Sequence, residues 1–152
     1  MHKEKNDLPL LLLDNSTMNV LSTGWFRIDK MSFEDAKYLI ESYDSKDILC
    51  CYSDRVIDTV IHDYLGIEKR DFTFKKIRKM RPGQMAIVFK FYTEGSASQP
   101  VIEPEPGIQA KKIQNVYIYC ECISNVDSVI QSLIESVKGK NQPNFPGDLL
   151  KG

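Results

Sequence analysis

The residues best suited to bind a ligand follow a short apolar segment in the first half of the chain. The sequence from 47 to 66 predicts a short buried strand, a polar corner at Ser53, Asp54 and Arg55, and then an amphipathic helix. The first N–H groups of a helix lack intrahelical partners and lie at the positive end of its dipole, so they can bind an anion. The planar guanidinium of Arg55 suits bidentate contacts to phosphate. The corner therefore predicts a site for a phosphate-bearing ligand.

Structural roles compete with ligand binding at this corner. Asp54 is a favourable N-cap residue, and its carboxylate can cap the helix with one oxygen while contacting a ligand with the other. A positive charge is disfavoured at a helix N-terminus, so Asp54 or Asp58 can simply neutralise Arg55. The sequence leaves both interpretations open.

Further candidate ligand-binding residues lie outside the corner. Asn15 and Ser16 follow the first predicted strand, and ligands of α/β sheets sit beyond the carboxyl ends of strands. Trp25 is a candidate for stacking on a base, with core packing as the alternative. The remaining candidates are Arg70 and Arg81, from a basic segment that can equally be a solvated strand face, and Glu94, which can orient a ribose or belong to a plain turn.

No familiar catalytic or metal-binding motif is present. The sequence contains no G-x-G-x-x-G, Walker loop, Ser/His/Asp set or H-E-x-x-H. The cysteines lack zinc-ribbon spacing, and His2 and His62 are the only imidazoles, so we expect buried, reduced thiols at Cys50, Cys51, Cys120 and Cys122. We therefore predict no catalytic residue, no metal and no cofactor.

Composition limits the class of protein. A chain of 152 residues, 42% hydrophobic and 27% charged, predicts one ordinary globular domain. A net charge of −1 argues against a duplex nucleic acid partner, which would require a basic face. No run approaches the roughly 18 apolar residues of a membrane span, and the apolar segment 8–13 does not have the pattern of a signal peptide. We expect no membrane partner.

Hydrophobic periodicity predicts an α/β fold with a compact mixed β-sheet of about five strands, flanked by three helices. We expect a flexible N-terminus at 1–7, a single α/β domain at 8–139 with an exposed loop at 95–111, and a C-terminal tail at 140–152. The apolar face of the last helix, which Asn125 caps, is expected to point inward. Strands at 72–77 and 84–92 are expected to form a hairpin around the turn-forming residues 81–83.

Five segments between Leu11 and Gly95 have an order and spacing typical of a known family. They are 11–18, 32–39, the strand–corner–helix ending at 64–67, 81–89 and 93–95. In these segments the chain resembles the viral ring nucleases of archaeal viruses and phages, which counter type III CRISPR signalling. The resemblance implies a homodimer or higher homo-oligomer, with the ligand at the two-fold interface.

The chain departs from that family at the corner. The nuclease members carry Gly-His-Glu-Ser-Thr there, with the His as catalytic acid, whereas Asp54 stands at the matching position of this sequence. A carboxyl group is normally ionised at neutral pH and is then a poor proton donor to a leaving alkoxide. His62 lies about two turns further along the predicted helix and cannot substitute locally. The departure therefore argues against hydrolysis by the family's mechanism.

A protein of this kind that has lost its acid can still hold the signal, as phage sponge proteins do. We predict a phage immune-evasion protein of the infected host's cytoplasm. Its partner would be a cyclic (oligo)nucleotide signal of CBASS, type III CRISPR or Thoeris defence, bound without cleavage. One alternative is an active ring nuclease that degrades cyclic oligoadenylate. A second is a non-enzymatic protein-interaction module of a phage.

Overall fold

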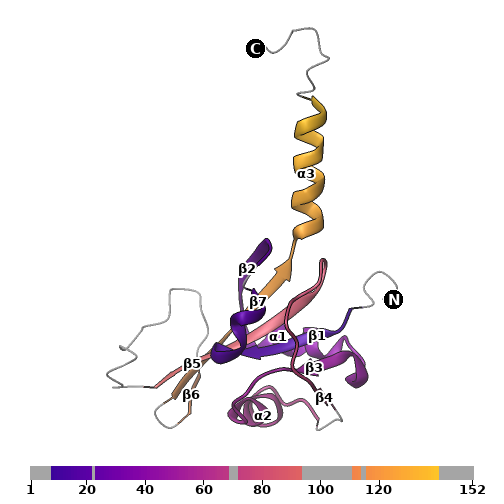
Figure 1. Cartoon of the computed structure of the whole chain (residues 1–152). Helices are drawn as coiled ribbons and strands as arrows, with labels where there is room; N and C mark the ends of the chain where they lie inside the picture. The colour runs from indigo at the N-terminus through magenta and orange to yellow at the C-terminus, as the bar shows by residue number, and fades with distance from the viewer. Residues whose placement is uncertain (1–7, 22, 69–71, 94–110, 114–115, 141–152) are drawn as a thin grey trace.

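One mixed β-sheet organises the residues that the computed structural model describes, namely 8–21, 23–68, 72–93, 111–113 and 116–140 (Figure 1). The strand order is β2-β7-β5-β1-β3-β4, and β6 pairs with β7 beside this path. The four strands β1, β3, β4 and β5 are mutually parallel, whereas β7 runs antiparallel to β2, β5 and β6. The bounds are β1 Leu10–Asp14, β2 Phe26–Met31, β3 Ile48–Cys50, β4 Thr73–Phe74, β5 Met85–Thr93, β6 Lys111–Ile113 and β7 Val116–Asn125.

Helical segments connect and flank the strands. They are the 3₁₀ segments η2 Asn15–Leu21 and η3 Ser45–Asp47, the α-helices α1 Phe33–Glu41, α2 Val56–Thr59 and α3 Asp127–Lys140, and the π-helical segment η4 Val60–Tyr64. The predicted α/β class, a mixed sheet with helices, is confirmed. The described part of the sheet has seven strands rather than about five, and one of the additional strands is β6, whose three residues are too few for periodicity to reveal.

The central strand β1, an unbroken run of leucines followed by Asp14, is buried on both faces. Leu10 and Leu12 point into one core layer, Leu11 and Leu13 into the other, and all four are 0% exposed. The first layer lies under α1, α2 and η4. The second lies under η2 and the connection between β4 and β5, which contributes the buried Met80. Two covered faces explain why β1 needs no polar alternation.

Local sequence signals account for the start of α1 and the end of η4, and the predicted burial of the cysteines is confirmed. Ser32 caps α1, with its hydroxyl accepting a hydrogen bond from the Asp35 amide at 3.0 Å. Gly66 ends η4 with φ +72°, a conformation that favours glycine. Cys50, Cys51, Cys120 and Cys122 are buried, unpaired thiols.

The predicted hairpin between 72–77 and 84–92 is wrong. The strands β4 and β5 lie on opposite sides of β1 and β3, with β4 pairing to β3 and β5 to β1. Because parallel strands require a crossover, the segment between them runs back over one face of the sheet and buries Met80. The turn at 81–83 does form, but it closes onto Asn125, whose carbonyl accepts from the Gly83 amide at 3.0 Å.

The predicted inward packing of the last helix is also wrong. Figure 1 shows α3 projecting away from the sheet, and the helix contains no fully buried residue. Its apolar side chains remain exposed, among them Val129 at 58%, Leu133 at 57% and Val137 at 56%. The periodicity identified a helix with an apolar face, but it did not identify what that face contacts.

Three predicted segments, 1–7, most of 95–111 and nearly all of 140–152, lie outside the described residues. Among the residues that are described, no helix has both the length and the hydropathy needed to cross a bilayer.

Candidate functional site

The polar residues that follow β1 and β3 meet at one edge of the sheet. The two strands are parallel, with Leu12 paired to Cys50, so the segments that follow them leave the sheet at the same edge. As a result, the hydroxyl oxygens of Ser16 and Ser53 lie 2.5 Å apart. Two residues that the sequence proposed separately are thus brought together where α/β sheets bind ligands.

A buried carboxylate, Asp14, holds these two ends together. Its Oδ1 accepts hydrogen bonds from the Ser16 amide at 3.0 Å and from the hydroxyls of Ser16 and Thr17 at 2.9 and 3.1 Å. Its Oδ2 accepts from the amides of Ser53 and Asp54 at 2.7 and 3.0 Å and from the Ser53 hydroxyl at 3.3 Å. Asp14 is 1% exposed and therefore links the end of β1 to the corner after β3.

The hydrogen bonds to Asp14 keep its carboxylate ionised. Burial alone raises the pKa of this group, because it disfavours the charged form. The hydrogen bonds from Ser16, Asp54, Ser53 and Thr17 outweigh burial, so the pKa of Asp14 lies below its ordinary value of 3.8. The corner therefore already contains an anion that belongs to the protein.

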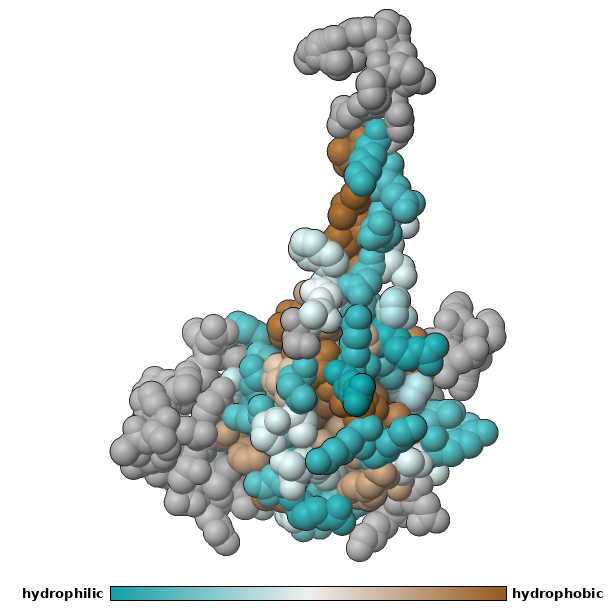
Figure 2. All heavy atoms as spheres, in the orientation of Figure 1, coloured by the Kyte–Doolittle hydropathy of each residue, from teal (hydrophilic) through white to brown (hydrophobic). Residues whose placement is uncertain are grey.

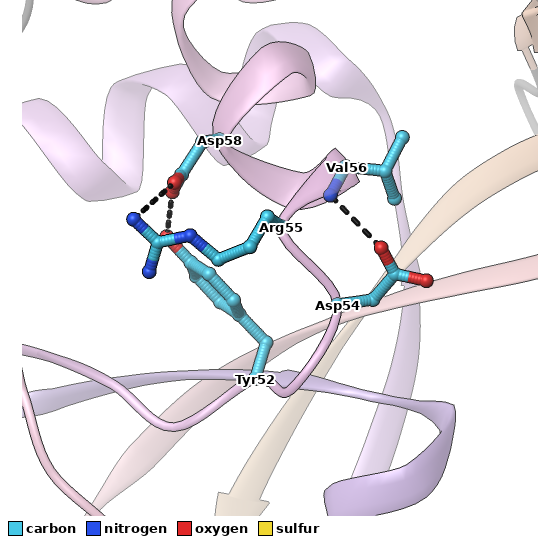
Figure 3. Close-up of polar contacts among 5 residues, drawn as sticks. All are labelled: Tyr52, Asp54, Arg55, Val56 and Asp58. Atoms are coloured by element: carbon cyan, nitrogen blue, oxygen red, sulfur yellow. Dashed lines mark hydrogen bonds and ion pairs between the residues drawn. The ribbon is translucent and has the colours of Figure 1, made fainter.

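This arrangement corrects the predicted anion site at the start of the second helix. The amides of Ser53 and Asp54 point at Asp14, and the Val56 amide donates to Asp54 Oδ1 at 3.0 Å (Figure 3). None of these three amides is directed at a ligand. The Asp54 carboxylate thus satisfies the first amide of α2, although the residue at the N-cap position itself is Arg55, which makes no side-chain capping bond.

Arg55 has partners within the protein as well. Its guanidinium forms an ion pair with Asp58 at 3.1 Å and lies 4.6 Å from the centre of the Phe74 ring. The Tyr52 hydroxyl also donates to Asp58 (Figure 3), and the rings of Tyr52 and Phe74 meet edge to face at 5.8 Å. The predicted neutralisation by Asp58 is present, and Arg55 stabilises the aromatic pair beside the corner.

A cavity of about 510 Å³ opens next to the corner. It lies between η2, the end of β3, β4 and the start of the connection to β5. Its volume is in the range of small-molecule sites, roughly 300–1,000 Å³. It is lined by Ser16, Thr17, Asn19, Val20, Cys50, Cys51, Tyr52, Ser53, Phe74, Lys75, Lys76 and Ile77.

The lining combines exposed cations with two protonated thiols. Lys75 and Lys76 are exposed cations, and neither forms an ion pair with another described residue. Burial raises the pKa of the Cys50 and Cys51 thiols to about 11, so neither is a nucleophilic thiolate at neutral pH. The lining thus offers hydroxyls, cations and the half-exposed ring of Phe74.

Of the predicted site residues that the structure describes, Ser16 and Ser53 line the cavity, whereas Asp54, Arg55, Asn15, Trp25 and Arg81 do not. Asn15 continues the β1–β5 ladder with its side chain, donating to the Phe91 carbonyl at 3.1 Å and accepting from the Phe91 amide at 3.0 Å. Trp25 precedes β2, at the opposite edge of the sheet from β4. Arg81 lies at the amino end of β5, whereas the cavity lies at the carboxyl ends of the parallel strands. Arg70 and Glu94 lie outside the described residues.

The sequence did not single out Asp14, Phe74, Lys75 and Lys76. Their position in the sequence could have identified the last three, because Phe74 ends β4 and the two lysines follow it, just as Ser16 follows β1. Applying the rule on carboxyl ends of strands to that strand would have found them.

Removing the cap at the corner should have a modest effect. We expect Asp54→Ala to lower the free energy of unfolding by about 1 kcal/mol, because the Val56 amide loses its acceptor. Urea unfolding measures the change. Asp54→Asn keeps a capping oxygen and should stay within a few tenths of a kcal/mol of the parent protein; an equal loss in both variants would contradict the capping role.

Comparisons with known proteins find structural likeness but no sequence similarity. No protein-family model matches the sequence, and no curated protein is significantly similar to it. Among solved structures, the chain is similar to B116 of Sulfolobus turreted icosahedral virus, with a TM-score of 0.45 and 16% identity. The match covers 75% of this chain and 97% of that chain. Similarity at this level supports no statement about function, so membership of the ring nuclease family stays a prediction.

Proposed function

We propose that this protein binds a cyclic nucleotide or cyclic oligonucleotide signal and retains it without cleaving it. The observation that carries the proposal is the cavity at the carboxyl ends of β1, β3 and β4, with hydroxyls, two lysines and an aromatic ring on its wall. This combination suits a ligand that is both anionic and aromatic. The corner amides are not part of the proposal, because Asp14 occupies them.

Each component of such a ligand has a matching group. The ammonium groups of Lys75 and Lys76 suit phosphate oxygens, with which charge-assisted hydrogen bonds form. Phe74, 49% exposed, suits a nucleobase, because every base can stack on an aromatic ring. The hydroxyls of Ser16 and Ser53 and the side chain of Asn19 suit ribose hydroxyls and base edges.

The same wall supports retention rather than cleavage. Neither a carboxyl group nor an imidazole is among the residues that line the cavity. His62 is engaged elsewhere, with Nδ1 lying 3.0 Å from the Ile67 carbonyl and its ring stacked on Phe72. General acid catalysis requires a proton donor within hydrogen-bond reach of the leaving group. The mechanism of the ring nuclease family, which uses a His as the acid, therefore has no matching group among the residues that line the cavity.

The biological setting of the proposal comes from the sequence. The resemblance to viral ring nucleases suggests that the ligand is a defence signal, sequestered by a phage protein in the cytoplasm of the infected host. Sequestration requires only affinity and sufficient copies of the protein.

Binding should appear first as thermal stabilisation. We expect one of the cyclic dinucleotides, cyclic tri- or tetra-adenylate, or cyclic ADP-ribose isomers to raise the melting temperature. A ligand at 100 times its Kd stabilises the folded state by about 2.7 kcal/mol, which is roughly 5–10 °C for a domain of this size. Differential scanning fluorimetry against the panel measures the shift.

The fate of the ligand separates the hypotheses. Protein incubated with the stabilising ligand is heated to release it, and the supernatant is analysed by mass spectrometry. Intact ligand supports retention, whereas a linear product identifies an active ring nuclease. A panel that leaves the melting temperature unchanged favours the protein-interaction module instead.

A further inference from the structure

The helix α3 carries an apolar face that no described part of the chain covers. Side chains at helical spacing form this face, and Figure 2 shows them as a brown stripe along one side of the helix. Every residue from 131 to 140 is exposed. An apolar stripe of this width normally packs against another element. The stripe consists of Val129, Ile130, Leu133, Ile134 and Val137.

The amino-terminal end of α3 is hydrogen-bonded to the segment that precedes β2. The Trp25 amide donates to Asp127 Oδ1 at 2.6 Å, and the Val126 amide donates to the Trp25 carbonyl at 2.9 Å. These contacts join the first turn of α3 to the strand edge at β2. The stripe is therefore held out from the body as a surface for a partner.

We propose that the partner is a second copy of this chain, with the two α3 helices packed antiparallel. Charge favours this occupant and this direction. Asp127 lies in the first turn of α3, and Lys138 and Lys140 lie in the last. An antiparallel pair centred between Leu133 and Ile134 places Asp127 near Lys140 of the partner subunit. A parallel pair would place like charges and like dipole ends together.

Four of the five stripe residues pair with one another in the same register. Around that centre, Ile130 faces the partner's Val137, and Leu133 faces the partner's Ile134. The helix has 14 residues and is therefore about 21 Å long, enough for two heptads of knobs-into-holes packing. The bodies of the two copies lie at opposite ends of the helix pair.

This interface leaves the cavity open and is independent of the proposed function. The helix α3 follows the end of β7 that pairs with the start of β5, with Ser124 opposite Met85. The cavity lies at the other end of the parallel strands. Each copy keeps its own cavity, in contrast to the shared two-fold site that the resemblance implied.

The oligomeric state of the full chain tests the pairing. We expect the parent protein to sediment as a dimer, and Leu133→Glu/Ile134→Glu to raise the dimer dissociation constant at least about 100-fold, because charges replace the centre of the stripe. Ser132→Glu adds a charge on the polar side of the same turn and should leave the dimer intact. A monomeric parent protein, or a double variant that dimerises equally well, overturns the proposal.

Disulfide trapping tests the direction of the pair and does not depend on the folding of the charged variant. Ile130→Cys and Val137→Cys are prepared separately, mixed and oxidised, while the four native cysteines stay buried. Antiparallel packing predicts a cross-linked dimer in the mixture and little in either protein alone. Cross-linking of Val137→Cys with itself would indicate a parallel pair, and the absence of cross-links in the mixture would exclude the register.

Discussion

Replacing Asp14 with alanine should lower the free energy of unfolding by about 3 kcal/mol or more. The change removes the acceptor for the amides of Ser16, Ser53 and Asp54 at a position that is 1% exposed. Buried amides without a partner are expensive, because water cannot replace the lost oxygen. Urea unfolding of Asp14→Ala measures the effect, and Asp44→Ala is the matched control. Asp44 is exposed and makes no capping bond, so its removal should change stability by less than about 0.5 kcal/mol.

Lowering the pH should remove the contribution of the Asp14 carboxylate to the free energy of unfolding. The pKa of Asp14 is depressed in the folded state, so its stabilisation is fully present above the ordinary value of 3.8 and is lost as the pH falls through the lower folded value. The stability difference between the parent protein and Asp14→Asn should therefore be constant near neutrality and shrink below about pH 4. A difference that stays constant down to pH 2 would show that the charge of Asp14 contributes nothing.

The features that could be predicted from the sequence depend on local chemistry. Four consecutive leucines suit a strand covered on both faces, and β1 is such a strand. Ser32 is a typical N-cap residue, and its hydroxyl accepts from the amide of Asp35, three residues later. Gly66 is a typical helix C-terminal residue, and it adopts a positive φ directly after η4. For the two helix ends the partner lies within a few residues, so the sequence contains both halves of the interaction. For β1 the leucines indicate burial on both faces but do not specify the elements that cover them.

The predictions that were wrong depend on distant partners. The turn at 81–83 was identified, but a turn does not specify which strands it separates, and β1 supplied the partner of β5 from more than seventy residues away. The apolar face of α3 was identified as well, but periodicity cannot distinguish a core from an interface between copies. The hydrophobic pattern thus predicted whether a segment is a helix or a strand, but it did not predict which element that segment packs against.

At the candidate site, too, the residue types could be predicted from the sequence, whereas their distant partners could not. Ser16 and Ser53 were chosen from separate strands, and the parallel register brought them together. The prediction of free amides at the corner was wrong because an acceptor 39 residues earlier in the chain, Asp14, binds the Ser53 amide. What remains available to a ligand is the cavity beside the corner and not the helix start itself.

The two ends of the sheet therefore have separate roles in our proposals. The carboxyl ends of β1, β3 and β4 carry the cavity, and the opposite end carries α3. Variants in one region should leave the other function unchanged. Loss of ligand binding in Leu133→Glu/Ile134→Glu would show that the two regions are coupled.

Replacing both Lys75 and Lys76 with alanine should weaken binding of the stabilising cyclic nucleotide by about 10- to 100-fold, or roughly 1.4–2.8 kcal/mol. The two ammonium groups are the cations on the cavity wall, and neither has an anionic partner among the described residues. Both are exposed, so the contribution of each is smaller than that of a buried ion pair. Isothermal titration calorimetry measures the change, and raising the salt concentration should weaken the parent protein more than the variant.

A matched control lies three residues further along the same connection. Arg78 and Lys79 are exposed cations that do not line the cavity. The variant Arg78→Ala/Lys79→Ala removes the same net charge as Lys75→Ala/Lys76→Ala and should retain most of the affinity. Equal losses in both variants would mean that the ligand responds only to the overall charge of the protein, and the cavity would then no longer be the binding site. A loss confined to Lys75 and Lys76 instead locates the phosphates at the carboxyl end of β4.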